Sequence, residues 1–353
     1  MDTIITDMAE KLFSDYGMLQ AGENGEDWPK ALWDIVEENG LPLALVPEQD
    51  GGFGVPVEQA LAIIRIAGKH AISIPLGETM VANWLLAEVA MPLPSGPLSV
   101  AASGDIELTH TQSGWRVRGT LGGISWGRTA SSVIALTEFE GETKLVSLRL
   151  ADLELTKQCN LAGEPWDQAA IDKPLGSDQV APITLSPDAI YVIGALLRSL
   201  AMAGALETIL DLSVAYANDR VQFGRSIGKF QAIQHMLATM ASEVAAARVG
   251  AEMAAEISAE RFSNGASVMH VAAAKQRCGE AAQTVAALAH QIHGAIGFTR
   301  EYELHRLTQR VWAWRDEFGA EMEWSQRLGK EVLTGSGDGY WPCITGLMEN
   351  AET

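Results

Sequence analysis

The stretch ANDRVQFGRSIGKFQAIQHMLATM, residues 217–240, decides the fold class of this chain. It leaves one alanine-rich segment with helical spacing, passes through a turn that contains Gly224 and Gly228, and enters a second helical segment. Arg220, Arg225 and Lys229 are grouped at this junction. Backbone N–H groups at a helix N-terminus, together with basic side chains, suit a pyrophosphate. The alternative is a solvated helical hairpin with basic residues at its end.

The texture of the sequence changes twice on either side of this junction. Alanine-rich helical spacing continues from about 186 to 333, with breaks near 224–228, 263–265 and 294–297, which predicts four long antiparallel helices. Residues 97–181 instead alternate or form short β-branched runs, with a hairpin turn expected at 140–143. Helices are expected before them, at 3–16, 29–39, 56–71 and 77–90.

This order predicts an α+β protein with three domains. They are an N-terminal α-helical domain (1–95), a middle antiparallel β-sheet domain (96–183) and a C-terminal four-helix-bundle domain (184–353). Helices and strands do not alternate, so a doubly wound nucleotide-binding sheet is disfavoured.

Composition excludes several classes of protein. The chain has 353 residues, 47% of them hydrophobic, and a formal net charge of −20, which repels nucleic acid. Cys159, Cys278 and Cys343 lack the spacing of a disulfide framework or zinc site, and His290 and His293 match no metal-ligand motif. The sequence has no eighteen-residue apolar run and no secretory leader pattern. We therefore expect a cytoplasmic protein with no metal site and no membrane insertion.

The junction segment resembles a motif of the acyl-CoA dehydrogenase family, R-x-x-F-G-x-x-[IL]-x-x-[FHY]-Q. The pattern falls, without a gap, on Arg220, Phe223, Gly224, Ile227, Phe230 and Gln231. In that family the matching arginine and phenylalanine reach the FAD of the neighbouring subunit. The resemblance therefore implies FAD as cofactor, with Arg220, Phe223 and Gln231 as contacts, in a homo-oligomer (dimer or tetramer) or a heteromer with a related subunit.

Two further segments are similar to the same family. AHQIHGAIGFTREYELHRL, residues 289–307, resembles its Q-x-x-G-G-x-G-[YF]-T-x-[ED]-[YF] run, where the family places the diphosphate and ribityl region of its cofactor. This implies that Gln291 and Gly294 contact FAD. In the middle domain, Ser125 aligns with a threonine that bonds the flavin edge near N5, whereas the family's T-E-P-x-x-G-S-D segment is absent.

The resemblance also implies a reaction, the α,β-dehydrogenation of an acyl-CoA thioester to the trans-2-enoyl-CoA. A carboxylate takes the α-proton, flavin N5 takes the β-hydride, and an electron-transfer flavoprotein is the expected electron acceptor. The family's usual glutamate aligns with Phe318, one residue after Glu317. An alternative glutamate position, on the first long helix, falls on Gly194. The predicted base is Glu317, with Asp316 or no base at all as the alternatives.

Three functions remain open at this point. The chain is a homomeric acyl-CoA dehydrogenase, or a base-less partner subunit of a heteromeric acyl-CoA dehydrogenase, or a related flavin oxidase or monooxygenase. Heteromeric pairs occur in the branch of the family that handles steroid side chains and other bulky acyl-CoAs. The missing middle-domain segment and the displaced acid favour the second alternative, the base-less partner subunit, more than the motifs taken alone do.

Overall fold

The computed structural model describes residues 4–16, 27–111 and 114–334, so Cys343 lies outside the described part. The first domain consists of four helices, α1 (Ile4–Tyr16), α2 (Lys30–Glu38), α3 (Val57–Lys69) and α4 (Leu76–Glu88). Helices α1 to α3 have one apolar face each, and they bury that face against the rest of the protein. Helix α4 is apolar on all sides and is buried from Leu76 to Leu86, because it lies between the other helices and the sheet.

The middle domain is a seven-stranded sheet with the order β5-β6-β2-β1-β3-β4-β7. Its strands are β1 (Leu98–Thr111), β2 (Gly114–Ser125), β3 (Ser132–Phe139), β4 (Glu142–Arg149), β5 (Glu154–Thr156), β6 (Trp166–Leu175) and β7 (Val180–Pro182). The predicted hairpin turn lies between β3 and β4, where Glu140 and Gly141 both have positive φ angles.

One strand pair differs from the antiparallel domain that the sequence predicts. The start of β1 pairs in parallel with β3, through the partners Leu98 with Ser132 and Val100 with Ile134. The parallel pair arises because β2 ends beside the start of β1, and β3 then begins at that same end of the sheet. The sheet is therefore mixed, although its other neighbours are antiparallel.

Within residues 184–334, the C-terminal domain has three long helices and two shorter ones. They are α5 (Ala189–Asp219), α6 (Gln231–Glu260), α7 (Val268–His293), α8 (Leu304–Asp316) and α9 (Glu321–Thr334). The breaks fall where the sequence predicts them, and the fourth expected helix is divided into α8 and α9 by a turn. The predicted order of a helical domain, a β-sheet domain and a helical domain is confirmed.

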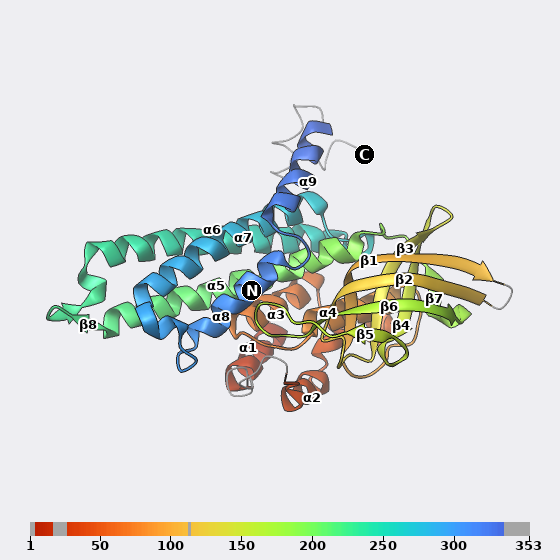
Figure 1. The fold of residues 1–353 in the computed structure, drawn as a ribbon, viewed down its shortest axis with the longest axis horizontal. Coiled ribbons are helices and arrows are strands. Elements are labelled where there is room, and N and C mark those ends of the chain that lie inside the picture. The colour runs from red at the N-terminus through yellow and green to blue at the C-terminus, as the bar shows by residue number, and fades with distance from the viewer. Residues whose placement is uncertain (1–3, 17–26, 112–113, 335–353) are drawn as a thin grey trace.

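Helix α5 is the centre of this arrangement. Its length and composition would also suit a membrane span, but 94% of its most apolar window is buried inside the protein. Helices α3, α6, α7 and α8 all pack against it, and it also contacts the sheet through β1 and β3. The sheet lies at one end of the molecule, and the short β8–β9 hairpin (Val221–Gln222 and Arg225–Ser226) lies at the far end of the bundle (Figure 1).

Candidate functional site

Four of the residues predicted to contact the cofactor line one cavity at the hairpin end of the bundle. This cavity, called the hairpin groove below, has a volume of about 480 Å³ and is lined by Arg220, Phe223, Gln291 and Gly294, among others. Arg220 caps the end of α5, Phe223 lies in the β8–β9 hairpin, and the other two end α7. The fold thus brings together two motifs that are about seventy residues apart in the sequence.

The remaining predicted contact at this end, Gln231, is the first residue of α6. It follows Phe230, which lines the hairpin groove and occupies the N-cap position of α6 without giving a side-chain hydrogen bond to the helix. The first N–H groups of α6 therefore receive no side-chain cap and are available to an anion.

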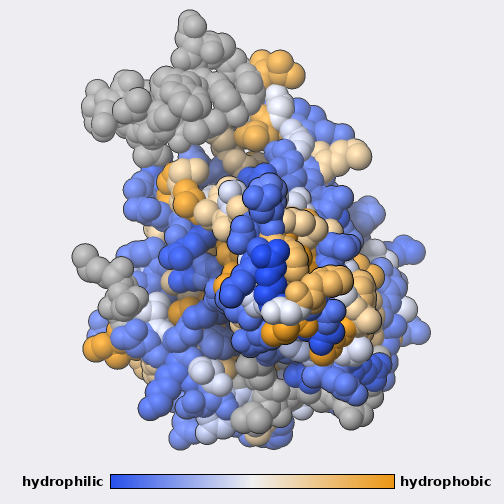
Figure 2. Space-filling model, turned by 90° about the vertical axis from the view of Figure 1, so that its left-hand side faces the viewer, coloured by the Kyte–Doolittle hydropathy of each residue, from blue (hydrophilic) through white to orange (hydrophobic). Residues whose placement is uncertain are grey.

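The surface of the hairpin groove is exposed and mixed in character. The side chain of Phe223 is 92% exposed, and Val221 and Phe298 are also exposed. Phe230 lies edge-on to Phe223, and the guanidinium of Arg225 lies 4.2 Å from the centroid of the Phe230 ring. Figure 2, which views this end of the molecule, shows hydrophobic side chains directly beside strongly hydrophilic ones. Apolar surface of this kind next to cations suits a ligand or partner that has both a ring and a charge.

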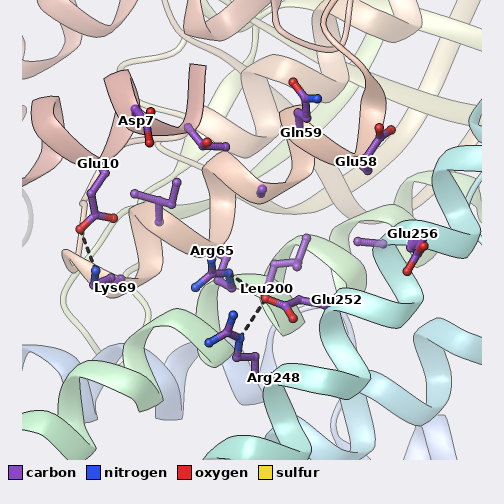
Figure 3. A pocket seen from close by; sticks show the side chains of 14 residues that line it. Asp7, Glu10, Glu58, Gln59, Arg65, Lys69, Leu200, Arg248, Glu252 and Glu256 are labelled. Carbon is purple, nitrogen blue, oxygen red and sulfur yellow. Dashed lines mark hydrogen bonds and ion pairs between the residues drawn. The ribbon is translucent and has the colours of Figure 1, made fainter. Parts of the chain in front are cut away.

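The cations of the hairpin groove contrast with those of a larger cavity on another face. That second cavity, of about 690 Å³, lies between α1, α3 and α6 (Figure 3). Its cations are paired with acids: Lys69 with Glu10, and both Arg65 and Arg248 with Glu252.

Arg220, by contrast, lines the hairpin groove, Arg225 and Lys229 follow it in the same turn, and no acid of the described chain forms an ion pair with any of the three. Unpaired cations at an uncapped helix N-terminus can hold a diphosphate, even on a protein with a net charge of −20. The residues present in the hairpin groove therefore fit the diphosphate of a dinucleotide. In the larger cavity, the cations already form ion pairs with acids.

The turn between α8 and α9 brings together the two positions at which the family's glutamate was sought. The Phe318 ring lies directly against Gly194 of α5, and a Cβ atom added at Gly194 would lie 2.2 Å from two Phe318 ring carbons. Trp166 of β6 packs edge-on against the same ring, with centroids 5.8 Å apart. An aromatic ring therefore fills the space in which a carboxylate from either position would project.

Glu317 points away from this space into a buried polar cluster. Arg198 Nε donates to Glu317 Oε2 at 2.5 Å, and Asn160 Nδ2 donates to Glu317 Oε1 at 2.8 Å. The Arg198 guanidinium also pairs with Glu78 of α4. Its carbon lies 5.4 Å from the centroid of the Phe318 ring.

Burial and pairing act on Glu317 in opposite directions. Burial raises the pKa of the Glu317 carboxyl above its ordinary value, while the positive charge of Arg198 and the Asn160 hydrogen bond lower it, and burial prevails. A raised pKa is a property of many general bases. Both carboxylate oxygens nevertheless accept hydrogen bonds from within the protein. Glu317 as the base therefore stays a prediction.

A second ion pair joins this cluster to the middle domain. Arg310 Nε of α8 donates to Glu164 Oε1 at 2.9 Å, and Ser73 Oγ donates to the same oxygen at 2.7 Å. Glu164 and Asn160 belong to the loop before β6, and Asn160 Nδ2 lies 3.3 Å from Glu164 Oε2. The sheet, the first domain and the bundle thus meet at one network of buried charges.

Ser125, the predicted flavin contact of the middle domain, lies apart from the hairpin groove. It is buried at the end of β2 and lines a cavity of about 50 Å³ together with Trp126, Glu78, Glu164 and Arg198. Such a volume holds a few water molecules. The neighbouring Trp126 ring packs against Trp28 of the first domain, at 5.3 Å between centroids.

The histidines beside the hairpin groove pack against aromatic rings. The His290 ring stacks on Phe298 with centroids 4.1 Å apart, and its Nε2 lies 3.1 Å from Thr308 Oγ1. The His293 ring stacks on Tyr216 at 4.5 Å. Burial lowers the pKa of both histidines. Of the two, His293 lines the hairpin groove.

Several buried charged residues of this region are absent from the predicted site, among them Glu78, Glu164, Arg198 and Lys275. Arg198 is a cation within a long apolar run, ALLRSLAMAGAL, and Lys275 directly follows the apolar stretch VAAA. Because such side chains are almost never buried without partners, their isolation was a usable indication of a buried network. The sequence could not indicate which acids they meet, since those come from other domains.

Comparisons with known proteins concern the family and the fold of the chain. Residues 193–320 match the family described as acyl-CoA dehydrogenase, C-terminal domain. The chain is 28% identical to acyl-CoA dehydrogenase IpdE2 of Mycobacterium tuberculosis, over 88% of this chain and 89% of that protein.

Among solved structures, the fold is similar to a chain of the ChsE4-ChsE5 complex of Mycobacterium tuberculosis. The TM-score is 0.82 at 20% identity, covering 94% of this chain and 96% of that one. Butyryl-CoA dehydrogenase of Megasphaera elsdenii has a TM-score of 0.78 at 20% identity, covering 94% of this chain and all of that chain. At these identities the structural likeness bears on the fold alone.

The contact between Gly194 and Phe318 leads to a first prediction. Gly194→Ala is expected to lower the free energy of unfolding by about 1–3 kcal/mol, because the new methyl group overlaps the Phe318 ring. Urea denaturation measures the change. In the double variant with Phe318→Leu, the loss should be smaller than the sum of the single losses. Gly250→Ala on α6 is the matched control: its Cβ has 3.8 Å to the nearest atom, so stability should be unchanged or slightly higher.

A second prediction concerns pH. Burial lowers the pKa of Lys275 from 10.5 to about 8. Electrostatic interactions with Glu317, Glu321 and Cys278 favour the protonated form, and the interaction with Arg198 disfavours it. Between these two values the unfolded chain holds a proton that the folded chain lacks, so stability rises with pH across this window.

Relative to Lys275→Met, the wild-type chain should therefore gain up to about 3 kcal/mol of unfolding free energy from pH 8 to pH 10.5. Chemical denaturation on both sides of the window measures this gain. If the difference in unfolding free energy between the two proteins does not change with pH, the lowered pKa of Lys275 is wrong.

Proposed function

We propose that the chain is the non-catalytic, cofactor-binding subunit of a heteromeric acyl-CoA dehydrogenase, since residues 193–320 match the C-terminal domain of that family and the chain is similar over most of its length to acyl-CoA dehydrogenase IpdE2. The observation that carries the proposal is the Phe318 ring packed against Gly194. Neither of the two positions considered for the catalytic glutamate has a carboxylate. The space between them is filled.

The difference in size between the cavity beside Arg198 and the hairpin groove supports the same function. The cavity beside Ser125 and Arg198 has about 50 Å³, which is too small for the ring system of a flavin, whereas the hairpin groove is open with about 480 Å³. We propose that Arg220, Phe223, Gln231, Gln291 and Gly294 hold the diphosphate and adenosine side of an FAD. When bound, FAD supplies the acceptor for the substrate hydride.

In this proposal the partner is a related chain that brings a glutamate, an open acyl-CoA pocket and the flavin-ring site. The present chain supplies cations and an uncapped helix N-terminus from across the interface. The structural neighbour from Mycobacterium tuberculosis is itself a chain of a complex, ChsE4-ChsE5. The hairpin groove lies at the end of the bundle farthest from the sheet, so its ligand is open to contact with a second subunit (Figure 1).

A second candidate function rests on the burial of Glu317. A desolvated carboxylate with a raised pKa is suited to take the α-proton of an acyl-CoA, with an electron-transfer flavoprotein as the final acceptor of the electrons. In that case the chain is a complete, homomeric dehydrogenase. Glu317 would then have to leave Arg198 and Asn160, and Phe318 would have to leave Gly194, before a substrate enters.

The visible spectrum of the purified protein tests the main proposal. Produced alone, the chain should contain little flavin and should not oxidise acyl-CoA thioesters. Co-expressed with a related chain that has a glutamate at the position of Phe318 or Gly194, it should purify as a flavin-containing, active complex. In that complex Arg220→Ala should weaken FAD binding by about tenfold or more, because a charge-assisted contact to phosphate is lost.

Arg248→Ala is the matched control, since this arginine lines the other cavity and pairs with Glu252. It should leave the flavin content unchanged. If the chain alone binds one FAD per subunit and oxidises an acyl-CoA, the partner-subunit proposal is wrong.

Glu317→Gln separates the two candidate functions. In the active complex this variant should retain the rate of flavin reduction by acyl-CoA to within about a factor of two, since the partner supplies the base. A loss of a hundredfold or more, with the flavin content retained, would instead assign the base to Glu317. Stopped-flow measurement of flavin bleaching gives the rate, and the flavin-to-protein absorbance ratio gives the content.

A further inference from the structure

The turn between α8 and α9 has a conformation that needs support. Phe318 is a non-glycine residue with a φ of 53°, in the left-handed region, and Gly319 follows with a φ of 90°. A bulky residue in this region is strained and persists only where its surroundings hold it. The direction of both Glu317 and Phe318 depends on this conformation, because one side chain points to Arg198 and the next to Gly194.

One side chain from another helix bridges this turn. Lys275 lies in the middle of α7 and is 1% exposed. Its Nζ donates to the carbonyl oxygen of Arg315 at 2.7 Å and to that of Gly319 at 2.6 Å. The first carbonyl belongs to the last turn of α8, where carbonyl groups lack partners within the helix. The two carbonyls lie on either side of Glu317 and Phe318 in the sequence.

We infer that Lys275 is the positioning residue of this turn: by holding the carbonyls on both sides of Glu317 and Phe318, it sets the direction of both side chains. It thereby keeps the ring on Gly194 and the carboxylate on Arg198. The inference does not depend on the proposed function. If the chain is non-catalytic, Lys275 keeps its acyl pocket filled; if Glu317 is the base, Lys275 sets the position of that base.

This role needs two N–H donors rather than a charge. A protonated amine has three N–H bonds and a neutral amine has two, so either form can reach both carbonyls. Glu317 and Glu321 face Lys275 and favour its charged form, whereas burial and Arg198 favour its neutral form. The bridge is therefore expected to persist on both sides of the titration, while the charge changes.

Other contacts fix the far side of the same turn. Trp324 Nε1 of α9 donates to the carbonyl oxygen of Phe318 at 2.8 Å, and Arg315 pairs with Glu321. These contacts attach the turn to α9, which follows it directly. Lys275 attaches the turn to α7, and hence to the core of the bundle, so its removal should release the turn without detaching α9 from it.

Hydrogen–deuterium exchange of the full chain, read by mass spectrometry at one pH, tests the inference. In Lys275→Met, which keeps the length of the side chain but has no donor, amides in peptides spanning 313–321 should exchange about tenfold faster. The Glu317 amide, which donates to the Ala313 carbonyl at 3.1 Å, belongs to this group. Peptides from strands β1 and β2 should exchange as in the wild type.

Cys278→Ala is the matched control for a loss of packing in the same helix. Cys278 lies one turn further along α7, is fully buried, and its thiol lies close to the carbonyls of Ser199 and Ala247 rather than to the α8–α9 turn. This variant should lower global stability without faster exchange confined to 313–321. Equal effects of both variants across the chain would mean that Lys275 is only a packing residue.

Lys275→Gln provides the conservative variant. Its amide keeps two N–H donors, so exchange in 313–321 should fall between that of the wild type and that of Lys275→Met, and it remains measurable if the methionine variant does not fold. Unchanged exchange of this segment in Lys275→Gln and, where it folds, in Lys275→Met would overturn the inference.

Discussion

The guanidinium of Arg198, buried between two carboxylates, is the interaction on which the arrangement of this protein depends. Glu78 comes from the first domain and Glu317 from the end of the bundle, while Arg198 lies in the central helix. Each of these charges would be costly to bury alone, by several kcal/mol. The guanidinium meets both carboxylates only when α4, α5 and the α8–α9 turn are in place, so the burial of these charges couples the positions of the three segments.

The same network determines what space is left for a ligand. The middle domain is included through Asn160 and Glu164, which bond to Glu317 and Arg310. Both carboxylate oxygens of Glu317 accept hydrogen bonds from within the chain, and the Phe318 ring covers the apolar side. A substrate thioester would have to replace these contacts with equally good ones, and a thioester oxygen is a far weaker acceptor than a carboxylate. The arrangement with Glu317 on Arg198 and Phe318 on Gly194 is therefore the stable one for this chain on its own.

The sequence predicted the order of a helical domain, a β-sheet domain and a helical domain well, because that order depends on local patterns. Helical spacing in the bundle, alternation in the sheet and the motif from Arg220 to Gln231 are each legible within a short window. The central network was not predicted, since Arg198, Glu78 and Asn160 meet only through tertiary packing. The parallel pairing of β1 with β3 was missed for the same reason, because strand order is decided by a crossover. Counting residues from the motifs did place Phe318 and Gly194 at equivalent functional positions, and in the structure the two are in contact.

The two cavities therefore differ in how the chain uses its charges. Around Arg198, acids and bases from three domains neutralise one another and leave about 50 Å³. At the hairpin groove, Arg220, Arg225 and Lys229 have no acidic partner in the described chain, although the protein has a large excess of acids. On a protein with so many acids, internal ion pairs would be a favourable alternative for these cations, yet the cations stay unpaired. Such an arrangement is suited to an anion from outside the chain, which is the kind of ligand that the proposed function assigns to the hairpin groove.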